Sequence, residues 1–308
     1  MENKTLIRTG ATRVLQFNKL EAKHIPLLQQ FFRKYPSRSC DFSVAGVLMW
    51  VDYFEYEFAI SHDSLFIKGR IPDTDTYIFY RPVGKVSLPE SEKLIRQYCS
   101  LHNIEGMILL PEELEADAQP FNSLEDPLID DWKEYLYDAE RFRSFAGKKM
   151  EKKRNHLNFF HNNYADAVIE DVSMADICDL IDFTIRFDAE HYDDDLSRYE
   201  CEQTVNVLRE YDKYGYIGKA FRYHGKIIGY TFGEVIGDTL FAHVEKGNIE
   251  YRGVYQALAS ALCQEGFKVN PDLKYVNREE DMGYESLRQS KLSYHPTLFI
   301  HKRLRCLD

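Results

Sequence analysis

A histidine and a glutamate occupy alternate positions of a predicted strand in the C-terminal third of the chain. The segment TLFAHVEKG spans residues 239–247, and strand alternation gives it a face with Phe241, His243 and Glu245. The other face is apolar and carries Leu240, Ala242 and Val244. Imidazole and carboxylate groups can take a proton from a substrate, so Glu245 or His243 is the predicted general base.

A run of charged side chains follows the next predicted strand. The segment VNREEDMGYESLRQSKLSY spans residues 276–294, and its strand end carries Asn277, Arg278, Glu279, Glu280 and Asp281. We expect the first four of these to line the wall opposite the predicted base, where Arg278 and Lys291 would hold a carboxylate, a phosphate or an oxyanion. Tyr294 belongs to the same substrate- or donor-binding set. The alternatives are a solvated turn and a structural ion-pair network, in which Glu245 pairs with Lys246 or Arg278.

A basic run lies near the middle of the chain, in SFAGKKMEKKRNHLNFF, residues 144–160. Its cations lie within two helical turns and are opposed only by Glu151; they are Lys148, Lys149, Lys152, Lys153 and Arg154. On a chain with a net charge of −11 this run is a local exception, and it predicts a face that binds a tRNA backbone or an anionic donor. The alternative is a solvated helix between two domains.

The composition favours a soluble cytoplasmic protein. The chain has 308 residues, 44% of them hydrophobic, which is enough for one large domain or two smaller ones. Its 50 acidic and 39 basic side chains disfavour indiscriminate binding to nucleic acid or anionic lipid. The six cysteines are scattered without a C-x-x-C pair, so we expect reduced thiols and no metal site. No stretch approaches the roughly 18 apolar residues of a membrane span, and no secretory signal is apparent.

The second half of the sequence predicts the element order β-α-α-β-β-β-α-β-α-β. The predicted helices cover residues 174–187, 197–215, 253–268 and 284–291. The predicted strands cover 166–172, three hairpin-connected strands from 216 to 247, then 274–277 and 297–305. The first half echoes this order, with predicted helices at 20–35, 42–54 and 91–102 and predicted strands between residues 57 and 138. These boundaries predict an N-terminal unit (1–143), a basic linking helix (144–165) and a C-terminal unit (166–308) with the site.

Three segments carry a resemblance to a known family: SFAGKKMEKKRNHLNFF, HVEKGNIEYRGVYQAL (243–258) and YVNREEDMGYESLRQSKLSY (275–294). Over roughly residues 40 to 300 the chain resembles the tandem GNAT family related to the C-terminal catalytic part of bacterial phosphatidylglycerol lysyltransferases. Fem-type transferases that depend on aminoacyl-tRNA are more distant relatives. The resemblance implies an α+β fold of two GNAT-like units in tandem, each a mixed sheet flanked by helices. It also implies that the fourth and fifth strands splay apart around an acyl donor.

Two motifs that bind or use coenzyme A in GNAT enzymes are altered. The pyrophosphate turn, usually Arg/Gln-x-x-Gly-x-Gly/Ala, keeps Gly253 as a donor-binding residue, but Glu250 and Tyr255 add negative charge and bulk. In the motif Tyr-x-Lys-x-Gly-Phe, Gln289 stands at the place of the tyrosine that protonates the leaving thiolate. An aminoacyl ester on tRNA leaves as a ribose hydroxyl and does not need that tyrosine.

These observations predict an acyl- or aminoacyltransferase that uses an amine or hydroxyl acceptor, such as a small molecule or a peptide. The co-substrate is aminoacyl-tRNA or acyl-coenzyme A, with aminoacyl-tRNA favoured, and no bound cofactor is assigned. The competing hypothesis is a catalytically silent tandem GNAT module that binds a small ligand or a protein partner. A general nucleic-acid binder is the third alternative.

Overall fold

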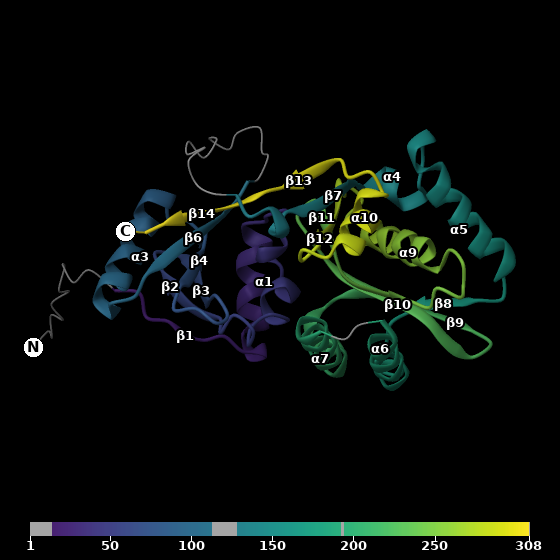
Figure 1. Cartoon of the computed structure of the whole chain (residues 1–308), viewed down its shortest axis with the longest axis horizontal. Coiled ribbons are helices and arrows are strands. Elements are labelled where there is room, and N and C mark those ends of the chain that lie inside the picture. The colour runs from purple at the N-terminus through teal and green to yellow at the C-terminus, as the bar shows by residue number, and fades with distance from the viewer. Residues whose placement is uncertain (1–13, 113–127, 192–193, 308) are drawn as a thin grey trace, which may run out of the picture.

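The computed structural model describes residues 14–112, 128–191 and 194–307, which form two mixed sheets placed side by side (Figure 1). The first sheet has the order β1-β2-β3-β4-β6-β14, and β5 pairs with β3. Its strands are β1 (Asn18–Lys19), β2 (Glu57–Ser61), β3 (Ser64–Arg70), β4 (Tyr77–Tyr80), β5 (Val83–Gly84), β6 (Gly106–Pro111) and β14 (Lys302–Cys306).

The second sheet has the order β13-β7-β12-β11-β10-β9-β8. Its strands are β7 (Glu134–Asp138), β8 (Val168–Asp171), β9 (Ile217–Tyr223), β10 (Lys226–Ile236), β11 (Thr239–Gly247), β12 (Tyr275–Glu280) and β13 (Leu298–Ile300). Most neighbours are antiparallel, but β11 pairs with β12 in parallel. A parallel neighbour requires a crossover, and α9 supplies it.

Helices cover both faces of the second sheet. One face carries α6 and α7, and the other carries α9 with α4 and α5 packed against it. The helices are α1 (Ile25–Lys34), α2 (Val44–Leu48), α3 (Leu88–His102), α4 (Ala139–Ser144), α5 (Glu151–Asn163), α6 (Ile177–His191), α7 (Asp195–Arg209), α8 (Tyr211–Tyr214), α9 (Val254–Val269) and α10 (Glu285–Leu292). No helix within the described ranges has both the length and the apolarity that crossing a bilayer requires.

The two halves repeat one topology, which confirms the predicted tandem α+β fold. In each half, three antiparallel strands lead through a long helix into a parallel neighbour: β2-β3-β4, α3 and β6 in the first, and β9-β10-β11, α9 and β12 in the second. The two halves share the order of their elements and the direction in which their strands pair. Hydrophobic periodicity was sufficient to find the shared order.

The two halves also exchange strands, which the predicted domain boundaries do not anticipate. β7 falls inside the predicted N-terminal unit but pairs with β12 and β13 of the second sheet. β14 falls inside the predicted C-terminal unit but pairs with β6 of the first sheet. The single strand predicted at 297–305 is likewise two strands in two sheets, and both run along the same edge of the molecule in Figure 1. Pairing partners distant in the sequence decide these assignments, so local pattern could not.

The helix predicted over residues 42–54 is also shorter than expected. Only α2 is helical, because turns follow it and Glu55 adopts a positive φ of 50° before β2 begins. After these turns Trp50 stacks on Tyr199 of α7, and Phe54 contacts Trp132.

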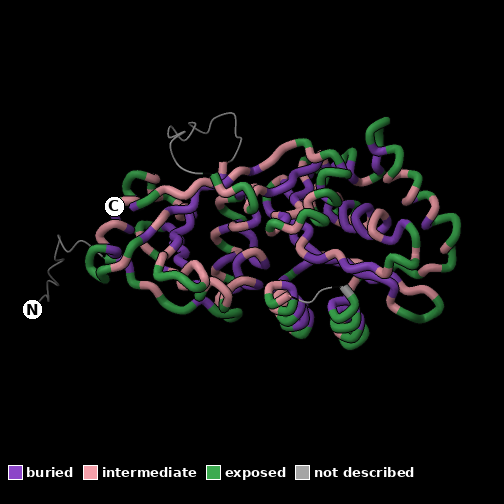
Figure 2. Tube along the Cα trace, in the orientation of Figure 1, coloured by how far each residue is buried: buried purple, intermediate pink, exposed green. Residues whose placement is uncertain are grey.

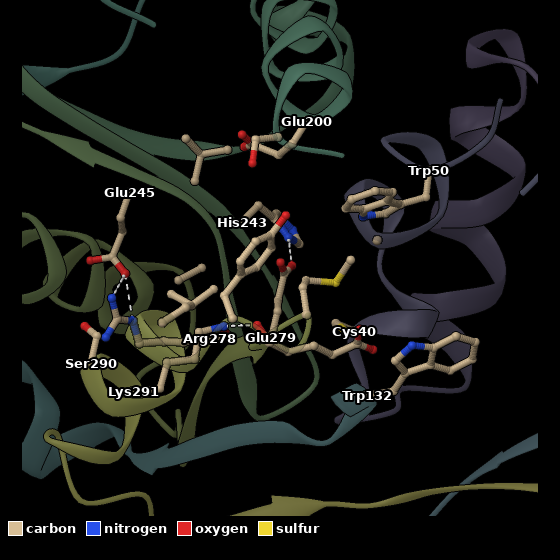
Figure 3. Close-up of a pocket in the computed structure, with 18 of the residues that line it drawn as sticks. Cys40, Trp50, Trp132, Glu200, His243, Glu245, Arg278, Glu279, Ser290 and Lys291 are labelled. Carbon is tan, nitrogen blue, oxygen red and sulfur yellow. Dashed lines mark hydrogen bonds and ion pairs between the residues drawn. The ribbon is translucent and has the colours of Figure 1, made fainter. Parts of the chain in front are cut away.

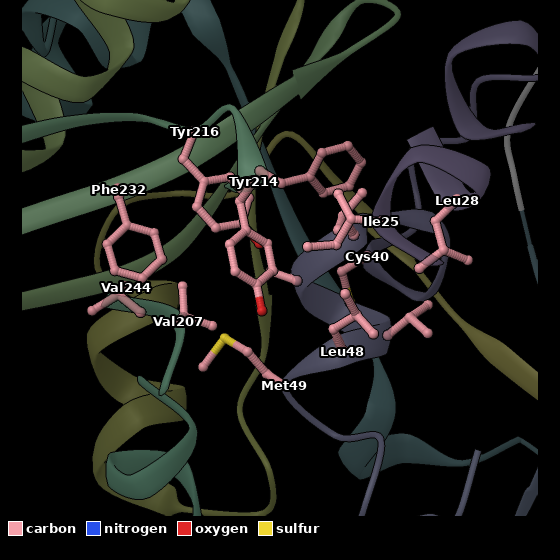
Figure 4. Packing of buried hydrophobic residues seen from close by; sticks show 14 of the residues in the cluster. Ile25, Leu28, Cys40, Leu48, Met49, Val207, Tyr214, Tyr216, Phe232 and Val244 are labelled. Carbon is pink, nitrogen blue, oxygen red and sulfur yellow. The ribbon is translucent and has the colours of Figure 1, made fainter. Parts of the chain in front are cut away.

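One buried cluster joins the two halves. Leu28 and Leu48 of the first half belong to the same core as Phe232 and Val244 of the second, and Figure 4 shows Met49 and Tyr214 between them. Figure 2 shows buried backbone in both sheets and exposed outer faces on α6 and α7. Contacts between halves are therefore part of the hydrophobic core, and we expect the halves to fold as one unit.

Candidate active site

The strands β11 and β12 separate after three residue pairs. They pair only from Thr239 with Tyr275 to Phe241 with Asn277, although both strands continue. Residues beyond the separation line a cavity of about 570 Å³, together with α7, α10 and the first half of the chain (Figure 3). The splaying expected from the family resemblance is therefore present.

Two β-bulges aim side chains into this separation. On β11, Phe232 pairs with Val244 and Gly233 with Ala242, which leaves His243 as the extra residue. On β12, Arg278 and Glu279 together oppose one residue of β7, and Glu279 takes a positive φ of 60°. Bulges bend a strand and redirect its side chains, and they occur often beside active sites.

The bulge at His243 also overturns the predicted alternation. Phe241 and Val244 belong to one core, and Leu240 and Ala242 belong to the other. Odd-numbered residues before position 243 and even-numbered residues after it therefore point to the same face of the strand. Both faces of β11 are buried, instead of one apolar face and one site face. His243 and Glu245 still line the same cavity, but they reach it from different sides of the strand.

His243 lies between two carboxylates. Its Nδ1 is 2.7 Å from Glu279 Oε1 and its Nε2 is 3.1 Å from Glu234 Oε1, and the side chain is almost fully buried. Burial opposes the charged ring, but the hydrogen bonds to Glu234 and Glu279 raise the pKa of His243 to about 9. A ring that donates from both nitrogens has no free lone pair, so the predicted role of His243 as general base does not fit this geometry.

Glu245 and Arg278 form an ion pair across the separation. Arg278 Nε and Nη2 lie 2.8 Å and 2.6 Å from the same oxygen, Glu245 Oε2. The second oxygen, Glu245 Oε1, and the third nitrogen, Arg278 Nη1, are buried and have no hydrogen-bond partner among the described residues. Such atoms cost about 1–3 kcal/mol each when left unsatisfied. The pair therefore holds one spare acceptor and one spare donor beside the cavity, and neither atom is exposed to solvent.

Two lysines and a tyrosine form the wall next to Arg278. Lys291 Nζ donates to the carbonyls of Arg278 and Glu280, and Lys153 Nζ donates to Ser293 Oγ at 2.6 Å and lies over the ring of Tyr294. Burial, with the Arg278 charge nearby, lowers the pKa of Lys291 and of Lys153 to about 8 each. Tyr294 accepts a hydrogen bond from Gln256 and stacks under Arg278. Lys153, Lys291 and Tyr294 all line the cavity, so this wall suits an anion.

The other predicted residues take different places. Asn277 is fully buried and bonds Arg38 O, Glu134 and the backbone of Glu279, so it connects the two halves instead of lining the cavity. Arg154 donates to the carbonyls of Phe145 and Gly147 and closes the turn after α4. Three cations of the basic run are exposed at or near the start of α5 and lie away from the cavity lining: Lys148, Lys149 and Lys152.

Gly253 is also outside the cavity lining. It precedes α9 with a φ of 92°, and a Cβ at this position would lie 2.1 Å from the carbonyl oxygen of His156 in α5. Helix α5 therefore packs directly on the turn that was predicted to bind the donor. Within that turn Glu250 N donates to Asn248 Oδ1, and Arg252 lies over Phe159.

Glu280 belongs to a buried cluster that closes the cavity floor. The ammonium of Lys302 pairs with Glu280, with Asp41 at 2.9 Å and with Glu134 at 3.1 Å. Burial and the neighbouring carboxylates raise the pKa of Glu280 to about 7 and also raise the pKa of Asp41. Cys40, Asp41, Glu134 and Glu280 bring potential metal ligands within 4.8 Å of one another, but the Lys302 ammonium already occupies the space between the carboxylates. The cluster does not fit a resident metal.

The first half of the chain supplies an aromatic wall that sequence reasoning missed. Trp50 and Trp132, the two tryptophans of the chain, both line the cavity, and Figure 3 shows them on the side away from Glu245. Phe54, Tyr56 and Tyr80 complete this wall. On a third side Glu200 of α7 pairs with Lys246 at 3.0 Å. The chain has only two tryptophans, and their rarity was the one sequence feature that could have drawn attention to them. It does not indicate that the two residues lie close together in the fold.

Comparison with known proteins gives a consistent family and fold. The model of the family described as "Phosphatidylglycerol lysyltransferase, C-terminal" matches residues 32–304. An uncharacterized protein of Mycoplasmoides gallisepticum is 31% identical over 175 residues, which are 55% of this chain and 54% of that protein. The match thus spans about half the length of this curated relative.

Solved structures show the same fold at low identity. A conserved protein of unknown function from Bacteroides thetaiotaomicron has a TM-score of 0.83 at 24% identity and covers 96% of this chain and 100% of its own. L-PGS from Bacillus licheniformis has a TM-score of 0.62 at 13% identity, covering 91% and 90%. At these identities the similarity shows the architecture alone.

Proposed function

Because this chain belongs to the phosphatidylglycerol lysyltransferase C-terminal family, we propose that it transfers an activated acyl group to an amine or hydroxyl acceptor inside the cavity. Family membership supports acyl or aminoacyl transfer as the reaction class. The observation that carries the proposal is the separation of β11 and β12, with Glu245 and Arg278 facing each other across it. Reacting groups held in a cavity gain from proximity and from preorganised charge.

The donor in this proposal is an aminoacyl ester of tRNA rather than acyl-coenzyme A. A coenzyme A pyrophosphate needs an open helix N-terminus with free N–H groups. Here α5 packs against Gly253, and the Glu250 carboxylate adds negative charge to the same turn. The cationic wall of Lys153, Lys291 and Arg278 can instead hold the phosphate next to the terminal ribose, and the exposed lysines near the start of α5 can extend the contact to the tRNA backbone.

In the proposed reaction, the two atoms without a partner, Glu245 Oε1 and Arg278 Nη1, each have one role. The acceptor amine attacks the ester carbonyl carbon, so a C–N bond forms and the bond from carbon to the ribose oxygen breaks. Glu245 Oε1 takes the proton that the amine loses and returns it to the departing ribose oxygen. Arg278 Nη1 donates to the carbonyl oxygen as negative charge develops on it. The protonated His243 holds Glu279 in place and takes no part as a base.

The test compares donors with purified protein. Aminoacyl-tRNA and acetyl-coenzyme A are each offered with a panel of small amines, and the acylated product is identified by mass spectrometry. We expect product from aminoacyl-tRNA, and a loss of about 100-fold or more in Glu245→Gln, which keeps the shape of the side chain. Product from acetyl-coenzyme A alone would overturn the donor assignment. Donor binding without any product would favour the silent module.

A second measurement tests the cationic wall. A non-hydrolysable 3′-aminoacylamino-3′-deoxyadenosine 5′-phosphate carries the phosphate that the cationic wall would hold, and it is short enough to leave the outer face of α5 untouched. We expect Lys153→Met to weaken its binding at least tenfold, whereas Lys226→Met, at an exposed lysine that is the first residue of β10, changes it less than twofold. Equal affinity in both variants would show that Lys153 does not contribute to ligand binding.

A further inference from the structure

The cavity wall contributed by the first half of the chain is aromatic and carries no cation. Among the described residues from 40 to 132 that line the cavity, five are aromatic: Trp50, Phe54, Tyr56, Tyr80 and Trp132. Asp41 is the only ionised side chain in this set, and lysine and arginine do not occur in it. This wall therefore has no group that would neutralise a phosphate or a carboxylate.

The floor beneath this wall carries more negative than positive charge. Three carboxyl groups, those of Asp41, Glu134 and Glu280, share the single ammonium of Lys302, and Glu280, with a pKa of about 7, is partly ionised at neutral pH. Next to them Glu279 lines the cavity with 27% of its side chain exposed, and one of its oxygens is bonded to His243. Glu279 Oε1 and Glu280 Oε1 accept these bonds, so the other oxygen of each carboxylate remains for a ligand.

The opposite wall has the reverse balance. Lys153 donates to a serine hydroxyl and Lys291 to two backbone carbonyls, and neither has a carboxylate within ion-pair distance among the residues described. The cavity is thus polarised, with a cationic wall at α5 and α10 and an aromatic, anionic wall at the first half of the chain. A donor phosphate is stable only at the first wall. The acceptor must then lie at the second.

We propose that the aromatic wall is the acceptor subsite and that it takes a small aliphatic diamine instead of the anionic headgroup of a phospholipid. This inference rests on the proposed function for the reaction itself. One ammonium lies against Trp50 and Trp132 and is paired by Glu279 and Glu280, because ammonium groups are attracted to aromatic faces and carboxylates. The other amine reaches the separation between β11 and β12, where Glu245 Oε1 is buried and unpartnered. The alkyl chain between the two nitrogens contacts the apolar part of the wall.

Calorimetric titration of the full chain tests the subsite without any donor. The ligands are 1,4-diaminobutane, n-butylamine and vesicles that contain phosphatidylglycerol. We expect the diamine to bind at least tenfold more tightly than the monoamine, and the vesicles not to bind. Glu279→Gln and Trp50→Leu should each weaken diamine binding at least tenfold, and two variants are used so that one unstable protein does not end the test. Asp130→Asn removes an exposed carboxylate of the same region outside the cavity and should change binding less than twofold.

The outcomes separate this inference from the proposed function. Equal affinity for diamine and monoamine, unchanged binding in both cavity variants, or vesicles that displace the diamine would each overturn the diamine subsite. Transfer from aminoacyl-tRNA to other amines, with no preference for 1,4-diaminobutane, would overturn it while the proposed function stands. Tight diamine binding sensitive to Glu279→Gln, with no transfer from any donor, would support the subsite and overturn the proposed function.

Discussion

Arg278 Nη2 lies 2.6 Å from Glu245 Oε2 and joins two strands whose backbone pairing has already ended. The side chains of both residues are about nine-tenths buried, so the pair forms in a medium of low polarity. Breaking a buried ion pair leaves an uncompensated charge, which is why one partner without the other is costly. The pair therefore stabilises the separated strands as well as presenting groups to a ligand.

Removal of Arg278 should destabilise the protein more than removal of the whole pair. We expect Arg278→Met to lower the free energy of unfolding by about 3–5 kcal/mol, because it leaves Glu245 buried and unpaired. Adding Glu245→Gln to that variant should restore part of the loss. Urea denaturation of the two single variants and the double variant measures the coupling. Strictly additive effects would show that the two side chains do not depend on each other.

The charge on His243 should make stability depend on pH. The folded-state pKa is about 9 and the ordinary pKa of histidine is about 6.5, so the imidazolium favours the folded state. Its contribution, on the order of 3 kcal/mol, is fully present below pH 6.5 and is lost as the pH rises through 9. We expect the difference in unfolding free energy between the wild type and His243→Gln to shrink between pH 6.5 and 10. A difference that stays constant over this range would mean that the ring is neutral.

Two glycines in the left-handed region provide a matched pair. Gly253 has φ 92° and ψ 0° and Gly215 has φ 67° and ψ 32°, but a Cβ at Gly215 would meet only the Gln29 side chain at 3.8 Å, whereas one at Gly253 would meet the His156 carbonyl at 2.1 Å. Gly215→Ala should therefore cost only the strain of its backbone, about 1–2 kcal/mol. Gly253→Ala should cost clearly more, because α5 must also move. Thermal unfolding of both variants measures the difference, and similar melting temperatures would show that α5 is loosely packed on α9.

Loss of the ammonium at the cavity floor should destabilise the protein in a pH-dependent way. Lys302→Met leaves Asp41, Glu134 and Glu280 without a cation, and we expect a loss of about 3–5 kcal/mol at pH 8. The loss should be smaller at pH 5.5, because the raised pKa of Glu280, about 7, allows this group to be protonated there. Lys85→Met, at an exposed ion pair with Asp63, should stay within about 0.5 kcal/mol at both pH values. A Lys302 variant that is as stable as this control would show that the cluster does not stabilise the contact between the halves.

Periodicity located most helices and strands, but it failed where pairing is non-local. The order of the second half from β8 to α10 agrees with the prediction because each of these elements has its own hydrophobic period and turn signals. The sequence of β13 and β14 predicts a single strand because no turn signal separates the two. Their partners β7 and β6 belong to different sheets. The same limit explains why β7 was assigned to the wrong unit.

The candidate site was predicted in part. His243, Glu245, Arg278 and Glu279 lie together because adjacent strands bring their ends together, and the pairing of Glu245 with Arg278 is the ion pair that the sequence analysis gave as the alternative. The role of His243 was not predictable, since it depends on Glu234 and Glu279 and on a bulge that changes the parity of β11. Gly253 and Asn277 were placed in the site from their positions in the sequence, but packing against α5 and against the first half of the chain excludes them from the cavity lining.

The sequence by itself determined the family, the repeated element order and the two segments whose charged side chains line the cavity. These properties depend on residue type and on spacing along the chain. Only the tertiary structure decided which strands each sheet receives, which protonation state His243 holds, and that Trp50, Trp132 and Lys302 surround the same space. The physical reason is that burial, hydrogen bonding and charge compensation depend on neighbours in space, and several of these neighbours, such as Asn277 with Glu134 and Lys302 with Asp41, lie more than a hundred residues apart in the chain.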